Sequence, residues 1–265
     1  MQVEISPNFR IEYSCAGSGP PIIFLHAFPL NNQMWHRQIN PLQGKYSCIA
    51  PNARGFGGTS AFESTPSIEQ QAHDVDAFLR ALPISESIVL CGLSMGGYAA
   101  LNFARLYPKR LRALILCDTR AEADSDETKT KRNANIDFVK EQGAGALVER
   151  VLPTLLSETT RKENLQLVEQ VKKWGKVQSA STLANAMEAL RDRTDATSWL
   201  SQIKVPTLLI FGEEDTLIPR AAIEILKNGI EDSQFEIIPR AGHLSNLENP
   251  GAFNTALLNF LRGLN

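Results

Sequence analysis

Apolar positions along this 265-residue chain form short continuous runs that alternate with longer segments of helical periodicity. Near the start, apolar and polar residues alternate over 3–5 and 11–14, which predicts an antiparallel hairpin at a sheet edge. The continuous runs predict buried strands near 22–26, 46–50, 87–92, 111–117, 207–211 and 235–238. Helical periodicity predicts helices near 34–40, 68–82, 95–107, 220–228 and 252–261. This order predicts an α/β fold with a mainly parallel central sheet and helices on both faces.

The alternation is interrupted between residues 121 and 197, where apolar residues recur at helical spacing and no strand is apparent. We interpret this segment as a helical cap, or lid, inserted into a core made of residues 1–120 and 198–265. The segment leaves the core after one predicted strand and returns before the next. We therefore expect it to lie over the carboxyl edge of the sheet, where open α/β sheets bind their ligands.

Composition narrows the class of protein. With 43% hydrophobic residues, the chain can bury one large core. The 27 basic and 29 acidic residues nearly cancel and form no basic stripe, which argues against nucleic-acid binding. No apolar run approaches the length of about eighteen residues that predicts a membrane span. The start lacks the basic and apolar regions of a signal peptide, so we expect a cytoplasmic protein, and a homodimer remains open.

Residues 92–96 read Gly-Leu-Ser-Met-Gly, and they follow the apolar run 88–91 and precede the helix-forming stretch 98–106. Gly92 and Gly96 lack a Cβ atom, so a strand can turn sharply into a helix around Ser94. Gly-x-Ser-x-Gly after a strand and before a helix is typical of a nucleophile elbow, which exposes the serine hydroxyl at the sheet edge. We predict that Ser94 is a nucleophile.

A serine hydroxyl needs a base within hydrogen-bond reach and a carboxylate that orients the base. Asp215 follows the predicted strand 207–211, and His243 follows the strand 235–238 after a glycine. The order of serine, aspartate and histidine is that of α/β-hydrolases. Asp118 also follows a strand, but we favour Asp215 as the acid and interpret Asp118 as a helix or cap-hinge residue.

A tetrahedral intermediate needs two fixed N–H donors for its oxyanion. The loop after the predicted strand 22–26 offers the N–H of Phe28, and the helix after the serine offers that of Met95. Pro29 has no N–H. We predict an oxyanion hole formed by Phe28 and Met95.

With these motifs, the chain resembles the α/β-hydrolase superfamily over nearly its whole length, particularly small bacterial esterases, 3-oxoadipate enol-lactonases and perhydrolases. The resemblance includes residues 26–29 where relatives have His-Gly-x-x, and 54–60 where they have Arg-Gly-x-Gly-x-Ser. Ala27 replaces a usual glycine, and Asn52 replaces a usual strand-end aspartate.

The resemblance implies a serine hydrolase that cleaves small carboxylic esters or lactones through an acyl-enzyme, with no cofactor and no metal. Three alternatives remain open: a ligand-sensing signalling protein on the same fold, a carbon–carbon bond hydrolase and a perhydrolase. Dehalogenases and epoxide hydrolases of this fold are disfavoured, because they have an aspartate where Ser94 stands.

Other candidates for the binding site carry competing structural interpretations. We expect His26 to orient the oxyanion loop by hydrogen bonds. Arg120, at the root of the cap, would bind a substrate carboxylate or pair with Glu122. The candidates for pocket walls, which would otherwise pack between cap helices, are Leu156, Trp174 and Met187. The mixed charges of residues 124–132 are interpreted as a solvated helix face.

Overall fold

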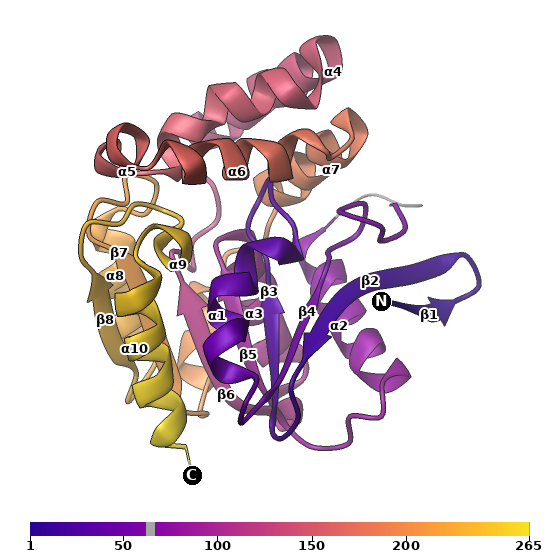
Figure 1. The fold of residues 1–265 in the computed structure, drawn as a ribbon, viewed down its shortest axis with the longest axis vertical. Coiled ribbons are helices and arrows are strands. Elements are labelled where there is room, and N and C mark those ends of the chain that lie inside the picture. The colour runs from indigo at the N-terminus through magenta and orange to yellow at the C-terminus, as the bar shows by residue number, and fades with distance from the viewer. Residues whose placement is uncertain (62–66, 265) are drawn as a thin grey trace.

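A twisted eight-stranded sheet forms the centre of the molecule, in a computed structural model that describes residues 1–61 and 67–264 (Figure 1). Its strands are β1 (Gln2–Ser6), β2 (Phe9–Ala16), β3 (Pro21–Leu25), β4 (Ser47–Pro51), β5 (Ile88–Leu93), β6 (Leu111–Cys117), β7 (Thr207–Gly212) and β8 (Gln234–Ile238). Their spatial order is β1-β2-β4-β3-β5-β6-β7-β8. The strands from β4 to β8 are parallel, and the β1-β2 hairpin joins β4 in antiparallel register.

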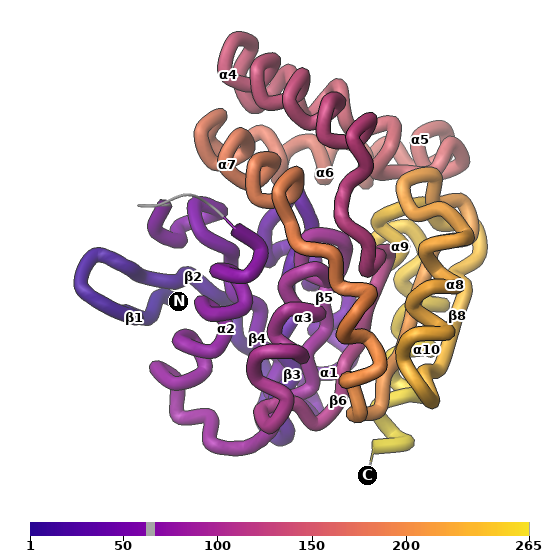
Figure 2. The backbone as a smooth tube through the Cα atoms, turned by 180° about the vertical axis from the view of Figure 1, so that it is seen from behind, coloured from indigo at the N-terminus to yellow at the C-terminus, as the bar shows by residue number. Residues whose placement is uncertain are grey.

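Helices cover both faces of this sheet. Those of the core are α1 (His36–Leu42), α2 (Ile68–Ala81), α3 (Met95–Leu106), α8 (Arg220–Gly229), α9 (Ser245–Glu248) and α10 (Pro250–Arg262), with short 3-10 turns at η1 (Asn32–Trp35), η2 (Pro108–Arg110) and η3 (Thr197–Gln202). Helices α1 and α10 lie on the face seen in Figure 1, and α2, α3 and α8 lie on the face seen in Figure 2. The fold is the predicted α/β-hydrolase fold, and each predicted strand and core helix is present with its ends within two residues of the expected ones.

The apolar core is divided in two by the sheet. Alternate residues of each buried strand belong to different clusters: Ile23 and Leu25 pack toward α2 and α3, whereas Ile22 and Phe24 pack toward α1 and α10. The central strands are apolar on both faces, because helices cover both. This explains why these strands appear in the sequence as continuous apolar runs.

Between β6 and β7 the chain forms a separate layer of helices above the carboxyl edge of the sheet (Figures 1 and 2). The layer contains α4 (Asp126–Leu155), α5 (Glu158–Glu163), α6 (Leu165–Lys176) and α7 (Ala180–Arg191). Helix α4 is interrupted at Gly143, which has a φ of 82°, and it packs against α6 and α7. Both halves of α4 contribute to the cavity described below.

Close backbone contact fixes the turn between β5 and α3. A Cβ atom on Gly96 would lie 2.2 Å from the Leu25 carbonyl oxygen, and one on Gly92 would lie 2.3 Å from the Gly96 carbonyl oxygen. Ser94, between them, has a φ of 53° and a ψ of −111°, a conformation that non-glycine residues rarely adopt. Because β3, β5, β6 and β7 are neighbouring parallel strands, the loops that follow them lie at one edge of the sheet.

We expect Gly96→Ala to lower the free energy of unfolding by about 3 kcal/mol or more, because the added methyl group meets backbone that cannot move aside. Gly44→Ala is the matched control, since a Cβ there has no neighbour within 4 Å, and it should change stability by less than about 0.5 kcal/mol. Urea denaturation of both variants checks this. Equal stability of the two would contradict the steric argument.

Candidate active site

The Ser94 side chain meets His243 at the carboxyl edge of the sheet. Ser94 Oγ lies 2.8 Å from His243 Nε2, a hydrogen-bond distance. The serine backbone is held in its strained conformation by its N–H, which donates to the Cys117 carbonyl at 2.9 Å. The geometry leaves the hydroxyl proton directed to a ring nitrogen that can accept it.

The other ring nitrogen of His243 faces a carboxylate. His243 Nδ1 lies 2.8 Å from Asp215 Oδ2, and both side chains are almost fully buried. The second oxygen, Asp215 Oδ1, accepts the backbone N–H of Leu217 at 2.7 Å and that of Ile218 at 3.3 Å. The structure thus brings together the three residues predicted from the sequence, in one line of hydrogen bonds.

Glu248 fixes the loop that carries His243, a role that the sequence did not reveal. Its Oε1 accepts the N–H groups of Gly242 at 3.0 Å and Leu244 at 3.3 Å. Its Oε2 accepts the N–H of Ser157, in the helical layer, at 2.8 Å. Three backbone donors on one carboxylate hold the loop rigid on either side of the imidazole.

Asp118 is a second carboxyl group behind this line. It is fully buried, accepts the Gly212 N–H at 2.8 Å and accepts a hydrogen bond from the Ser245 hydroxyl. These partners differ from the expected helix or cap-hinge contacts, because the side chain points into the sheet edge between β6 and β7. Burial, and then the charge of Asp215, raise the pKa of Asp118 well above its usual value.

Two backbone donors beside Ser94 have no acceptor of their own. In the described part of the chain, neither the Phe28 N–H nor the Met95 N–H donates a hydrogen bond to another group. Buried backbone N–H groups are nearly always paired. Met95 is 1% exposed, and Phe28 lines the same cavity as Ser94. The pair is therefore available to a bound oxygen atom.

A cavity of about 430 Å³ lies between the sheet edge and the helical layer, a volume typical of small-molecule sites. Ser94 and His243 contribute to its floor, and Met187 to its wall. The further lining residues are Phe28, Tyr98, Arg120, Thr128, Lys131, Arg132, Ala134, Asn135, Arg150, Val151, Thr154, Leu155, Leu190, Leu217 and Ile218.

Two of the residues considered as pocket walls do not line this cavity. Leu156 follows the last turn of α4 and is buried, and its neighbour Leu155 lines the cavity instead. Trp174 donates its indole N–H to Gln33 at 2.7 Å and lines a different groove.

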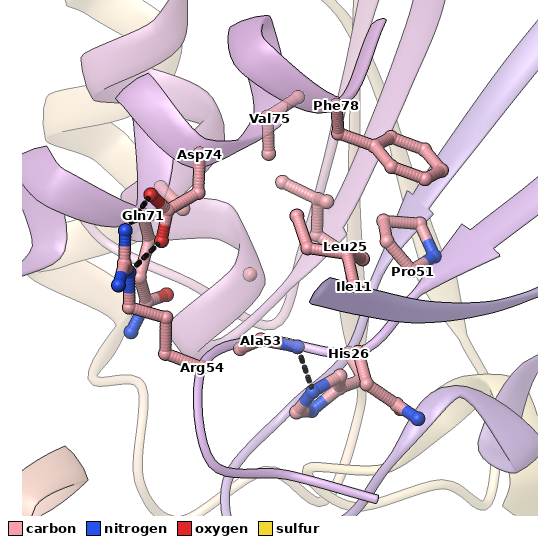
Figure 3. A pocket seen from close by; sticks show the side chains of 13 residues that line it. Ile11, Leu25, His26, Pro51, Ala53, Arg54, Gln71, Asp74, Val75 and Phe78 are labelled. Carbon is pink, nitrogen blue, oxygen red and sulfur yellow. Dashed lines mark hydrogen bonds and ion pairs between the residues drawn. The ribbon is translucent and has the colours of Figure 1, made fainter. Parts of the chain in front are cut away.

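His26 directly follows β3, two residues before Phe28, and Figure 3 shows its contact with the backbone of Ala53. Its Nε2 accepts the Ala53 N–H at 3.0 Å, and its Nδ1 donates to the Ala27 carbonyl at 3.1 Å. This arrangement requires the neutral imidazole. Burial lowers the pKa of His26 to about 4. The ring borders a small cavity of about 30 Å³, far too small for a substrate.

The charged segment 124–132 is not simply a solvated face. Asp124 has a fully buried side chain, which forms ion pairs with Arg132 and with Arg193, 69 residues further along the chain. Arg120 contacts Asp124 at 3.4 Å and not Glu122, whose carboxylate accepts the Ala121 N–H. The sequence interpretation failed because the partner that buries Asp124 is remote. Arg132 faces the cavity together with Arg120.

Nowhere in 1–61 or 67–264 do three His, Cys, Asp or Glu side chains gather in a way that could hold a metal ion. Across the same two ranges, no helix is long and apolar enough to cross a membrane. All four cysteines are free, and only Cys15 is exposed.

Comparison with known proteins identifies the family. A sequence model of the α/β hydrolase fold matches residues 20–250. This chain belongs to the α/β-hydrolase superfamily. The hydrolase is 30% identical to 3-oxoadipate enol-lactonase 2 of Acinetobacter baylyi, over 94% of this chain and 92% of that protein. It is 29% identical to the 2-hydroxy-6-oxo-6-phenylhexa-2,4-dienoate hydrolase of Burkholderia cepacia, over 96% and 92% of the two chains.

The structure of this hydrolase also resembles solved ones. A thermophilic esterase from Thermogutta terrifontis, solved with malate bound, has a TM-score of 0.94 and 33% identity, and the match covers 100% of this chain and 98% of that one. Esterases and lactonases among its relatives support hydrolase activity on esters or lactones.

We expect ester hydrolysis by this hydrolase to depend on pH through His243, because only the neutral imidazole can accept a proton. Burial lowers the pKa of His243, but the charge and hydrogen bond of Asp215 outweigh it and raise the pKa above 6.5. The rate kcat/KM should therefore rise with pH, with a midpoint above 6.5. In Asp215→Asn the midpoint should move to lower pH and kcat should fall by about 10⁴-fold.

The control for this pH profile is Asp137→Asn, at an exposed position of α4, which should leave the midpoint unchanged. An unchanged midpoint in Asp215→Asn would contradict the assignment of the titrating group.

We expect protonation of His26 to lower the free energy of unfolding as the pH falls. Its pKa is about 4 in the folded protein and 6.5 when unfolded, so the unfolded chain binds the extra proton first and stability falls as pH drops from 6.5 toward 4. The loss from this group should be about 2 kcal/mol at pH 5. Urea unfolding at pH 7.5 and pH 5 measures it. In His26→Gln, whose amide oxygen can still accept the Ala53 N–H, the decline should be smaller by that amount, and an equal decline would exclude His26 as its source.

Proposed function

We propose that this α/β hydrolase is a serine hydrolase that cleaves small carboxylic esters or lactones through an acyl-enzyme. The observation that carries the proposal is the unbroken line of hydrogen bonds from Asp215 to His243 to Ser94, 2.8 Å at each step, at the floor of a substrate-sized cavity. A serine hydroxyl gains nucleophilicity when a positioned base can take its proton.

In the acylation step, the Ser94 proton moves to His243 Nε2 as the Oγ–carbonyl carbon bond forms. Asp215 stabilises the imidazolium through its contact with Nδ1. His243 then gives the proton to the departing alkoxide oxygen, and the ester carbon–oxygen bond breaks. In a lactone that oxygen stays attached to the acyl group.

The oxyanion that develops is proposed to accept the N–H groups of Phe28 and Met95. Their lack of another acceptor supports this role, since preorganised donors cost no rearrangement when charge appears. His243 then takes a proton from a water molecule, which attacks the acyl-enzyme. The carboxylic acid product leaves and Ser94 returns to its starting state. The helical layer, as a lid, would limit access of bulk water to this chemistry.

Carbon–carbon bond hydrolysis is a second candidate, favoured by the similarity to the dienoate hydrolase. The same serine, histidine and oxyanion donors would serve it. A panel of esters, lactones and β-diketones distinguishes the two activities, because only a carbon–carbon hydrolase will cleave the diketone efficiently.

We expect Ser94→Ala to lower kcat for short p-nitrophenyl esters by about 10⁴-fold or more. The wild type should show a burst of p-nitrophenol and should form a covalent adduct with a phosphonate inhibitor, detected as a mass increase on the peptide that contains Ser94. The matched control, Ser201→Ala on an exposed turn, should keep wild-type activity.

Two results would overturn this assignment. Retained turnover in Ser94→Ala would show that the nucleophile is another group. A single slow turnover by the wild type, followed by a change in the helical layer and capture of a partner, would instead indicate a ligand sensor.

A further inference from the structure

One wall of the cavity above Ser94 is basic. Arg120, Lys131, Arg132 and Arg150 line it, and no described residue of the lining carries a carboxylate. These side chains come from the segment after β6 and from both halves of α4. A cavity with a surplus of cations and no acid attracts anions.

The buried carboxylate of Asp124 contacts this wall but does not neutralise it. Asp124 contacts the guanidinium groups of Arg193 at 2.5 Å, of Arg132 and, at 3.4 Å, of Arg120. This one carboxylate therefore contacts three guanidinium groups within ion-pair distance. Although burial raises the pKa of Asp124, its hydrogen bonds and ion pairs with Arg132 and Arg193 lower it below its usual value, so the carboxylate is already ionised at neutral pH.

The three arginines are not equivalent. Arg193 has a side chain only 2% exposed, donates to the Glu122 carbonyl at 2.7 Å and stacks over the Tyr98 ring, so it serves to hold Asp124 in place. Arg120 and Arg132 are each 20% exposed and line the cavity. The Arg120 Nε is buried and, within the described part of the chain, has no hydrogen-bond partner.

The other two basic residues stand at more exposed positions. Lys131 pairs with Glu127 at 2.6 Å, and both side chains are more than two-thirds exposed, so solvent weakens that pair. Arg150 stacks over the Phe138 ring, and no carboxylate of the described chain lies within ion-pair distance of it. Both add to the positive potential around the cavity.

A purely structural role explains Arg193 but not the surplus of positive charge on the basic wall. Arg193 donates to Oδ1 of Asp124 and Arg132 donates to Oδ2, so each oxygen has a partner before Arg120 is counted. Neighbouring guanidinium groups repel one another unless an anion joins them. Planar guanidinium groups bind carboxylates with directed, charge-assisted hydrogen bonds. The unmatched charge is thus an arrangement for a ligand.

We propose that this basic wall, with Arg120 and Arg132 as its principal donors, binds a carboxylate of the substrate, so that the enzyme acts on anionic esters or lactones. The proposal rests on the proposed function, since it places the ester bond at Ser94 and the carboxylate at the basic side chains that line the same cavity. It names the substrate class that the cavity selects.

The first test compares two esters of similar length, the mono-p-nitrophenyl ester of adipic acid and p-nitrophenyl hexanoate. The wild type should favour the anionic ester in kcat/KM by about tenfold or more. Arg120→Gln, and separately Arg132→Gln, should reduce that preference by about 10- to 100-fold, mainly by raising KM for the anionic ester. Arg120→Lys should restore part of the preference.

The control is Arg80→Gln, which removes one positive charge on exposed α2, away from the cavity, and should leave the preference intact. Higher salt should lower kcat/KM for the adipate ester and not for the hexanoate.

The second test needs no turnover. Calorimetric titration should show that adipate binds the wild type more tightly than neutral adipamide, and that Arg120→Gln weakens adipate binding by about tenfold or more. If neither ester is cleaved but adipate binds in this way, the proposed function fails and the anion site stands. If the hexanoate is cleaved but Arg120→Gln and Arg132→Gln change neither the ester preference nor adipate affinity, the anion site is overturned and the proposed function stands.

Discussion

Contact between backbones at the β5–α3 turn is the constraint on which the candidate site depends. Gly96 packs against the Leu25 carbonyl at the end of β3, and Gly92 packs against the turn itself, with no room for a side chain at either place. Ser94 is thereby held at a positive φ that costs energy and persists only because its surroundings determine it. The same contact fixes the loop after β3 relative to the start of α3, so the hydroxyl and the free N–H groups are positioned together.

Two carboxyl groups lie near His243, and their surroundings give them different properties. Asp215 contacts the imidazole directly, whereas Asp118 is enclosed by the Gly212 N–H and the Ser245 hydroxyl. Burial, and then the charge of Asp215, raise the pKa of Asp118 well above its usual value. Separation of two acids by environment is a common way to assign them different tasks.

Much of the fold and the central residues of the site could be predicted from the sequence, because their signals are local. The motif around Ser94 and the apolar runs each depend on neighbours within a few positions. Trp174 and Leu156 were harder to place, because the direction of a helical side chain in the layer depends on how its helices pack. Asp124 appeared to belong to a solvated helix face, because the sequence cannot show that Arg193 covers it.

The bonds of Glu248 limit how the helical layer can move. This one carboxylate accepts hydrogen bonds from the backbone beside the imidazole and from the Ser157 N–H. The Leu244 N–H also donates to the Leu155 carbonyl. The junction of α4 and α5 is thus hydrogen-bonded to the loop that carries His243. Any movement of the layer at this junction would also shift the loop that carries His243, and with it the imidazole relative to Ser94.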